Sequence, residues 1–197
     1  MGLEIGYKVF DKKLFPIKID DNEQNFVCGR CDVTHSWYNR AFDANYSDDN
    51  DKFVEVVVFN PEYDGHYSYY DNNDEYCMRM HYVPFKDFEK KVKYAIDEAF
   101  KNHADYIAEV KDLAHEKFVA IDEYRNLQLK AKTTAAFDGY QKLIEEAASC
   151  LAEYTNALKT YDEDDYEYTH AKIIKEMLEN IKKHLDNGEV VIAYYSD

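Results

Sequence analysis

Glycine is scarce in this sequence, with six residues among 197, and they stand far apart along the chain. A loop that cradles phosphate groups needs closely spaced glycines, because only backbone without side chains approaches the phosphate oxygens closely. Neither the GxGxxG pattern nor the GxxxxGK[ST] pattern occurs. The sequence therefore lacks these two nucleotide-binding signatures.

Long apolar runs are also missing. No window approaches eighteen consecutive apolar residues, and residues 1–10 lack the basic start and apolar run of a secretory signal. We therefore expect a cytoplasmic protein. Apolar residues still make up 46% of the sequence, which is enough to bury a core.

Basic residues are outnumbered, since 24 Lys and Arg face 40 Asp and Glu, and the formal net charge is −16. Residues 43–76 hold ten acidic residues and one basic residue, and residues 161–168 add five acidic residues and no basic one. Outside these two acidic segments the chain is nearly neutral. Binding to nucleic acid or to an anionic membrane requires Lys and Arg to neutralise phosphates, so we expect neither as a direct partner.

Hydrophobic periodicity predicts three helices in the second half of the chain. Apolar residues recur at alternating spacings of three and four within residues 84–131, 137–161 and 174–185. Pro84 suits the first turn of the first helix, and Gly188 suits the end of the last one. Because the first pattern is so long, we expect a kink or break near residues 102–105. Leu113 and Leu151 are expected to lie buried between the helices.

Runs of β-branched and aromatic residues predict strands at residues 3–10, 53–59, 77–83 and 189–195, and a short strand at 16–19. A short helix carrying Trp37 is expected from Thr34, and residues 63–76 are expected to form a surface loop. Because the last strand follows the helices, the chain is expected to return to the sheet. The predicted fold is α+β, with a small, mainly antiparallel sheet that includes the C-terminal strand and a long helical hairpin or three-helix bundle.

Three parts follow from this prediction. Residues 1–83 hold the sheet and the acidic, tyrosine-rich loops, residues 84–188 form the helical hairpin or bundle, and residues 189–197 supply the returning strand.

Four residues are candidate ligands of a structural zinc ion. Cys28 and Cys31 form a Cys-x-x-Cys pair, and Cys77 and His81 follow on a later predicted strand. Thiolates and imidazoles are the ligands of tetrahedral zinc sites. The alternative is that these are ordinary buried residues, and then no cofactor is expected.

A second candidate metal set combines Asp112-x-x-His115 with Glu167-x-x-His170, because a carboxylate and an imidazole three residues apart on helices build di-iron sites in bundles. Either metal set would make the chain a metal-binding protein or a metal-dependent enzyme. The alternative for Asp112 and His115 is a pair of solvent-facing neighbours. No spacing of Ser, His and acidic residues singles out a catalytic triad, so the sequence favours a protein that is not an enzyme.

Tyrosine is abundant, with 19 residues, and many of them flank the acidic residues. Tyrosine is enriched at protein interfaces. We therefore predict that the acidic segments bind a basic protein, such as a nucleic-acid-binding protein or nuclease, by presenting carboxylates as a phosphate backbone would. Ordinary solvated surface is the alternative. The predicted partner-binding residues are Asp48, Asp49, Asp51, Asp64, Tyr69, Tyr70, Asp71, Asp74, Glu75, Asp162, Glu163, Asp164, Asp165 and Glu167.

The opening residues Met1-Gly2-Leu3-Glu4 and the helix with Trp37 resemble the start of short bacteriophage proteins that open Met-Gly-Leu-Asp. The resemblance covers about the first forty residues. It implies a phage or mobile-element origin and a location in the host cytoplasm. Small acidic proteins of that origin often occupy the nucleic-acid channel of a host defence nuclease, so the resemblance implies an inhibitor of the anti-CRISPR or anti-restriction type.

A further hypothesis concerns the helical part alone. A narrow apolar stripe on a helix needs partner helices, so the hairpin is also a candidate for pairing with a second copy of the chain. In that case the protein is a structural, homodimeric one.

Overall fold

The computed structural model describes residues 4–10, 23–41, 53–59, 67–70 and 77–196, which divide into two compact units. The sheet unit comprises the described residues up to Ala99 and those from Tyr166 onward, and the hairpin unit comprises Phe100–Asp165. The sequence-based prediction divided the chain at residues 84 and 188, where the type of secondary structure changes. In the structure the boundaries lie at Ala99/Phe100 and Asp165/Tyr166, where the packing between residues changes.

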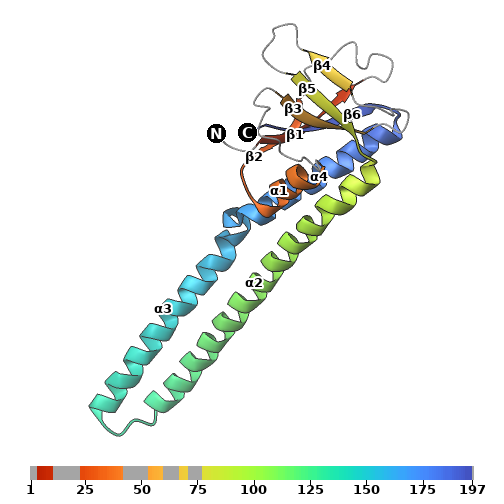
Figure 1. Cartoon of the computed structure of the whole chain (residues 1–197). Coiled ribbons are helices and arrows are strands. Elements are labelled where there is room, and N and C mark those ends of the chain that lie inside the picture. The colour runs from red at the N-terminus through yellow and green to blue at the C-terminus, as the bar shows by residue number, and fades with distance from the viewer. Residues whose placement is uncertain (1–3, 11–22, 42–52, 60–66, 71–76, 197) are drawn as a thin grey trace. The chain divides into compact units, whose positions relative to one another are not determined.

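A six-stranded sheet forms the centre of the sheet unit (Figure 1). The strands lie in the order β2-β1-β6-β3-β5-β4, and all neighbours are antiparallel except β3 and β5, which are parallel. The predicted α+β class, with a mainly antiparallel sheet and a returning C-terminal strand, is confirmed. The strands are β1 (Glu4–Phe10), β2 (Glu23–Cys28), β3 (Phe53–Phe59), β4 (Tyr67–Tyr70), β5 (Cys77–Tyr82) and β6 (Val190–Ser196).

β4 differs from the sequence-based prediction, which placed a surface loop over residues 63–76. Four of these residues pair antiparallel with β5. Three of the four are tyrosines, and tyrosine fits a pleated surface well once a neighbouring strand supplies hydrogen-bond partners. The strand predicted at residues 16–19 lies outside the described residues.

β6 lies between β1 and β3 in the sheet, and its residues are apolar on both faces. Val190, Val191, Ile192 and Ala193 are all buried. The strand pairs along its whole length with β1 and over four residues with β3. Continuous apolar runs of this kind are typical of strands that are covered on both sides.

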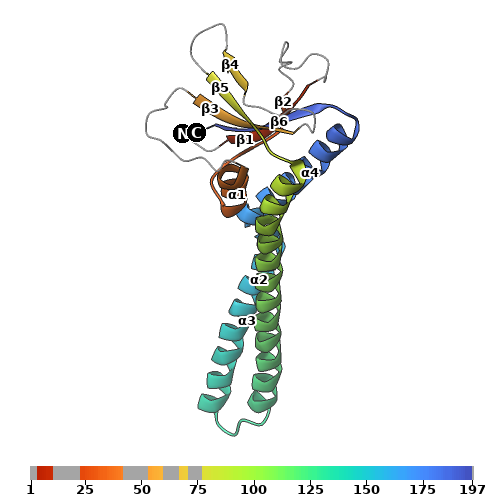
Figure 2. The same cartoon turned by 45° about the vertical axis from the view of Figure 1, so that its right-hand side comes forward.

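Helices cover one face of the sheet. α1 (Asp32–Ala41), α4 (Tyr166–Asp186) and the first turns of α2 (Phe85–Gln128) lie there (Figures 1 and 2). The ring of Trp37 packs edge-on against the ring of Phe88, with ring centroids 4.9 Å apart. The ring centroid of Phe88 also lies 4.9 Å from that of Phe59 in β3. α4 adds Ile174, Met177, Leu178 and Ile181, all buried.

α2 confirms the first part of the predicted apolar stripe, since Val92, Ile96 and Ala99 are buried. Of the kink or break predicted near residues 102–105, the break is absent, because α2 is one continuous helix from Phe85 to Gln128. That stretch contains neither proline nor glycine, so nothing in it removes a backbone hydrogen bond.

The hairpin unit consists of the rest of α2 and of α3 (Thr134–Asp164), which run antiparallel. Gln128 donates to Gln141 near the turn, and Tyr106 stacks on Tyr161 at the other end. Thr133 caps α3, since its side chain accepts a hydrogen bond from the Ala136 N–H at 3.2 Å. The turn between the two helices therefore ends at Thr133, and Thr134 is the first residue of α3.

No helix in the described part of the chain is long and apolar enough to cross a membrane.

Candidate functional site

The hairpin unit buries very few side chains. Within Phe100–Asp165 the buried residues are His103, Val110, Ile121 and Ala147. Leu113 and Leu151, which were predicted to be buried, are only partly covered, so that prediction is wrong for the single chain. Two helices present only one seam to each other, and residues at the flanks of that seam keep contact with solvent.

Large apolar side chains are exposed on both helices of the hairpin. Their exposed fractions run from 37% at Tyr106 to 84% at Leu129. An apolar surface of this kind usually marks an interaction site in a soluble protein. The exposed residues are Tyr106, Phe118, Val119, Leu127, Leu129, Phe137 and Leu143.

Helical geometry separates these residues by side. One residue step turns a helix by about 100°, so Phe118 lies about 60° from the buried Ile121, at the flank of the seam. Val119, the next residue, lies about 160° from Ile121, on the outer side of α2. Phe118 and Val119 are 59% and 40% exposed. Phe118 therefore belongs to the candidate interaction face, and Val119 does not.

The charge of the hairpin is balanced. Residues 100–160 hold ten acidic and eight basic residues. This stretch therefore carries little of the net charge of −16, and neither sign of partner is strongly repelled by it.

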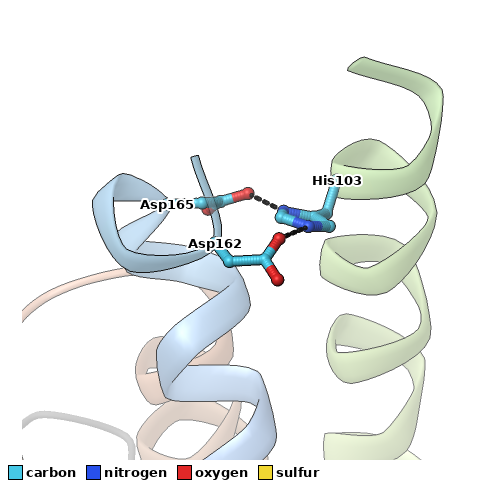
Figure 3. Close-up of polar contacts among 3 residues, drawn as sticks. All are labelled: His103, Asp162 and Asp165. Atoms are coloured by element: carbon cyan, nitrogen blue, oxygen red, sulfur yellow. Dashed lines mark hydrogen bonds and ion pairs between the residues drawn. The ribbon is translucent and has the colours of Figure 1, made fainter. Parts of the chain in front are cut away.

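A polar clamp ties the two helices at the end of the hairpin away from the turn (Figure 3). His103 Nδ1 lies 2.9 Å from Asp165 Oδ2, and His103 Nε2 lies 2.9 Å from Asp162 Oδ1. Ionised carboxylates only accept hydrogen bonds, so the imidazole donates to both when each of its nitrogens carries a proton. The Tyr161 ring stacks on His103 with centroids 5.0 Å apart. The clamp thus joins α2 to the C-terminal end of α3 by hydrogen bonds and a ring contact.

Residues 161–168 hold five of the acidic residues that were predicted to bind a partner. Three of these five contact other residues of their own unit. Asp162 and Asp165 bind His103, and in the sheet unit Glu167 Oε1 accepts a hydrogen bond from the Asp32 N–H at 3.1 Å. Glu163 and Asp164 are exposed. Partner binding by this segment stays a prediction, and so does the role of the other acidic segment. Of that segment, Tyr69 and Tyr70 lie in β4 with their side chains outside the described part, and Asp48, Asp49, Asp51, Asp64, Asp71, Asp74 and Glu75 lie outside the described residues.

The sheet does not bring the four predicted zinc ligands together. Cys28 ends β2, whereas Cys77 and His81 lie in β5, and three strands separate β2 from β5. Neighbouring strands stand about 4.8 Å apart, so the two strands are about 19 Å apart, much farther than two ligands of one ion. The strand order, which periodicity does not reveal, is what separates them.

Cys31 lies against His170 of α4 instead. The distance from Cys31 Sγ to His170 Nδ1 is 3.6 Å, and the two residues are 8% and 6% exposed. Desolvation by burial lowers the pKa of His170, which favours its neutral imidazole. Sequence analysis missed this pair because 139 residues separate its members.

The hydroxyl of Thr34 fixes the backbone around Cys31. It accepts a hydrogen bond from the Cys31 N–H at 2.9 Å and lies 2.9 Å from the Gly29 carbonyl oxygen. The helix was expected from Thr34, but α1 begins at Asp32 and Thr34 lies in its first turn. A side chain in the first turn that reaches back to the N–H before the helix is one half of a capping box.

The second predicted metal set is divided between the two units. Asp112 and His115 lie in the hairpin unit, where Asp112 and His115 are exposed, and Glu167 and His170 lie in the sheet unit. Among the side chains that the structure describes, no group of three or more His, Cys, Asp or Glu residues is placed to hold a metal ion.

Comparisons with protein-family models, with curated proteins and with solved structures give no match to this chain. The resemblance of the first residues to bacteriophage proteins therefore stays a prediction from the sequence.

Proposed function

We propose that the hairpin unit pairs with the hairpin unit of a second copy, and that the protein is a non-enzymatic, self-associating structural module. The observation that carries this proposal is the exposed apolar surface on α2 and α3. Isolated apolar side chains are common on protein surfaces. In this hairpin, however, apolar side chains stay exposed on both sides of the contact between its two helices, so the hairpin alone does not bury its apolar residues.

The size of the surface supports a second copy as the partner. One partner contributes about 800 Å² to a specific interface, and the exposed apolar side chains on both helices of the hairpin provide apolar area toward it. Two antiparallel hairpins make four helices, the number with which a bundle closes around a core. Such a bundle would cover Leu113 and Leu151, where periodicity predicts burial.

Charge also supports self-pairing. With ten acidic and eight basic residues in 100–160, two copies meet without strong repulsion. A partner of high positive or high negative charge would gain little from this part of the chain. The balance therefore favours a chemically similar surface, and a second copy provides it.

The test is the molar mass in solution, by light scattering after size-exclusion chromatography. The wild-type protein should have twice the mass of the chain. Phe118→Glu should raise the dimer Kd on the order of 100-fold, because each copy then buries an unpaired charge at a cost of at least about 1.4 kcal/mol. Circular dichroism of the same samples reports whether the helices persist.

Val119→Glu is the matched control, since it places the same charge one residue later on the outer side of α2 and should leave the mass unchanged. A wild-type chain that stays monomeric at its highest soluble concentration overturns the proposal. Equal effects of the two variants would show that charge in general, and not the flank of the seam, controls association.

As a second function, we propose that the acidic segments bind a basic protein. The supporting observation is that Glu163 and Asp164 are exposed and that the Asp162 side chain is 68% exposed, so neighbouring carboxylates face the solvent. If the basic partner is a nuclease of the host, the protein acts as an inhibitor of the anti-CRISPR or anti-restriction type.

Capture from host lysate at low salt, followed by mass spectrometry, should identify the basic partner. Its association rate should fall as salt rises, since charges on the surface are screened over about 8 Å at physiological ionic strength. The double variant E163Q and D164N should bind more slowly, whereas D122N with E123Q, which neutralises two exposed acids on α2, should not. Equal rates for both double variants would contradict the acidic-surface hypothesis.

A further inference from the structure

The two ends of the hairpin carry opposite charge. At the end with the turn, residues 125–142 contain four basic residues and one acidic residue, a formal net charge of +3. At the other end, residues 100–108 and 158–165 contain two basic and five acidic residues, a formal net charge of −3. We call these stretches the tip and the base of the hairpin. The tip is therefore basic, although the whole chain carries −16.

The basic side chains of the tip are exposed, and none of them makes an ion pair with another residue that the structure describes. Exposed charges of one sign at an apolar surface favour a partner that presents the opposite sign. The four side chains are those of Arg125, Lys130, Lys132 and Lys142.

One of these basic residues lies on the same side of α2 as Phe118. Arg125 comes seven residues after Phe118, which is almost two full turns, so the two side chains leave the helix in nearly the same direction. The candidate interaction face therefore continues from an apolar residue in the middle of the hairpin to a basic residue at the tip.

The base presents carboxylates to the solvent. The Asp162 side chain is 68% exposed even though it contacts His103 (Figure 3), and Glu163 and Asp164 after it are exposed. Within the described part of the chain, Glu163 and Asp164 make no ion pair. The base thus offers the charge that the tip lacks.

One face of a hairpin can form two kinds of symmetric pair. When the two-fold axis runs along the helices, tip meets tip and base meets base, so like charges meet at both ends. When the axis runs across the helices, each tip lies on the base of the other copy, and opposite charges meet at both ends. The middle of the hairpin meets itself in both pairs, so its charge does not choose between them. Charge complementarity therefore favours the second pair.

We propose that the two hairpins pair antiparallel, with the basic tip of each copy on the acidic base of the other. This orientation rests on the self-association proposed above, and it adds what the apolar surface alone leaves open. Arg125, Lys130 and Lys132 of one copy then face the carboxylates around Glu163 and Asp164 of the other, and the exposed apolar residues lie between these two charged contacts.

The test is the distance between spin labels on two copies of the full chain, measured by pulsed electron paramagnetic resonance. A ketone-bearing amino acid carries the label, so the native cysteines stay unlabelled. Ala135 is exposed at the tip. Labels there should stand about 45 Å apart, because α3 has 31 residues and a helix rises about 1.5 Å per residue. A distance below about 25 Å would mean that the tips meet, since neighbouring helices in a bundle stand about 8–10 Å apart.

A label at Ser149 is the control for pairing itself, because Ser149 is exposed near the middle of α3. The middle meets itself in both orientations, so these labels should stand less than about 25 Å apart in either one. If neither position gives a distance between copies, the self-association is wrong and the orientation with it. Short distances at both positions overturn the orientation alone.

Charge reversal tests the two ends through the dimer Kd, measured by sedimentation equilibrium. K130E with K132E, and separately E163K with D164K, should each raise the Kd at least about 10-fold, because attraction becomes repulsion at both ends of the pair. All four changes in one chain should return the Kd toward that of the wild type. If tip met tip, each double variant would remove a repulsion and lower the Kd.

K182E with K183E is the matched control, since it reverses two exposed basic residues in α4 of the sheet unit and should leave the Kd unchanged. A Kd that falls or stays constant in the tip and base variants overturns the antiparallel pair. An equal rise in the control would show that net charge, and not the contact of tip with base, controls the affinity, and would overturn it as well.

Discussion

The sheet unit and the hairpin unit bury their apolar residues to very different degrees. In the sheet unit, α1, α4 and the start of α2 pack on strands, and Trp37, Phe88 and Ile174 are fully buried. In the hairpin unit only four side chains are buried. Both units carry helices with the same spacing of apolar residues. The pattern shows which side of a helix is apolar, and only the number of neighbours decides whether that side is covered.

α2 contains this contrast within one helix. Val92, Ile96 and Ala99 belong to the sheet unit and are buried, while Leu113 and Leu127, on the same register, are partly covered or exposed. The first three lie in the unit that also holds the sheet, α1 and α4, whereas the last two lie in the unit whose other helix is α3. Residue type is nearly constant along the stripe, so the change in burial reflects what lies opposite.

The largest expected effect is the loss of a buried side chain in the sheet unit, compared with the loss of a partly covered side chain in the hairpin unit. Trp37→Ala should lower the free energy of unfolding of the sheet unit by about 3–5 kcal/mol, because it leaves a large cavity beside Phe88. Leu113→Ala should cost less than about 2 kcal/mol in dilute solution, since its site is already open to water. Urea denaturation followed by circular dichroism measures both changes, because Trp37→Ala removes the only tryptophan of the chain and with it the fluorescence signal. Equal costs would contradict the difference between the units.

Protein concentration should affect the costs of Leu113→Ala and Trp37→Ala differently. If two copies pair, the cost of Leu113→Ala should rise with protein concentration while that of Trp37→Ala stays constant, because only the hairpin gains stability from association.

Gly29→Ala should come next, with a cost of about 2–4 kcal/mol. A side chain at a φ of +136° is strained, and its Cβ would overlap the Tyr166 hydroxyl. Gly139→Ala is the control, because no atom lies within 4 Å of a Cβ at that position in α3, and alanine favours a helix by about 1 kcal/mol over glycine. The two alanine variants should therefore shift the melting temperature in opposite directions.

The clamp on His103 provides a comparison between two aspartates. The Asp165 side chain is 13% exposed and that of Asp162 is 68% exposed, although both oxygens lie 2.9 Å from the imidazole. A covered charge-assisted hydrogen bond contributes about 1.5–3 kcal/mol, and an exposed ion pair contributes about 0–1 kcal/mol. Asp165→Ala should therefore destabilise the hairpin more than Asp162→Ala, as measured by thermal denaturation at 222 nm circular dichroism. The reverse order would contradict the role given to burial.

Sequence patterns predicted where the helices and strands lie along the chain better than they predicted which strands lie side by side. Residues 53–59 were predicted as a strand and form β3 with the same ends, and the C-terminal strand does return to the sheet. The order of strands was not predictable, because hydrophobic alternation fixes which face a residue occupies and not which strand lies beside it. That order is the reason why Cys28 and Cys77 do not meet.

The contacts of the two buried histidines follow the same rule. His103 follows the spacing of three and four within residues 84–131, seven residues after Ile96, and it is buried. Its two carboxylate partners come from 59 and 62 residues later. His170 was noted for its carboxylate three residues earlier on α4, and it meets Cys31, which is 139 residues away. Local spacing drew attention to the two histidines, and only the fold identified their partners.

The smallest expected effect concerns Tyr7 in the sheet unit, whose side chain is 1% exposed. Burial raises the pKa of Tyr7, the nearby Glu176 raises it further, and a hydrogen bond with Asn180 lowers it in part. The folded state then keeps the phenolic proton at a pH where the unfolded state, with a pKa of about 10, has lost it. Stability from this group is full below about pH 10 and is lost as the pH rises through the folded pKa. Tyr7→Phe should cost about 1 kcal/mol at neutral pH, through the hydrogen bond, and this deficit should shrink above pH 10. Urea denaturation at pH 7 and above pH 10 measures the difference between the two proteins, which removes the common contribution of the other tyrosines. A deficit that stays constant across that range would show that Tyr7 ionises equally in both states.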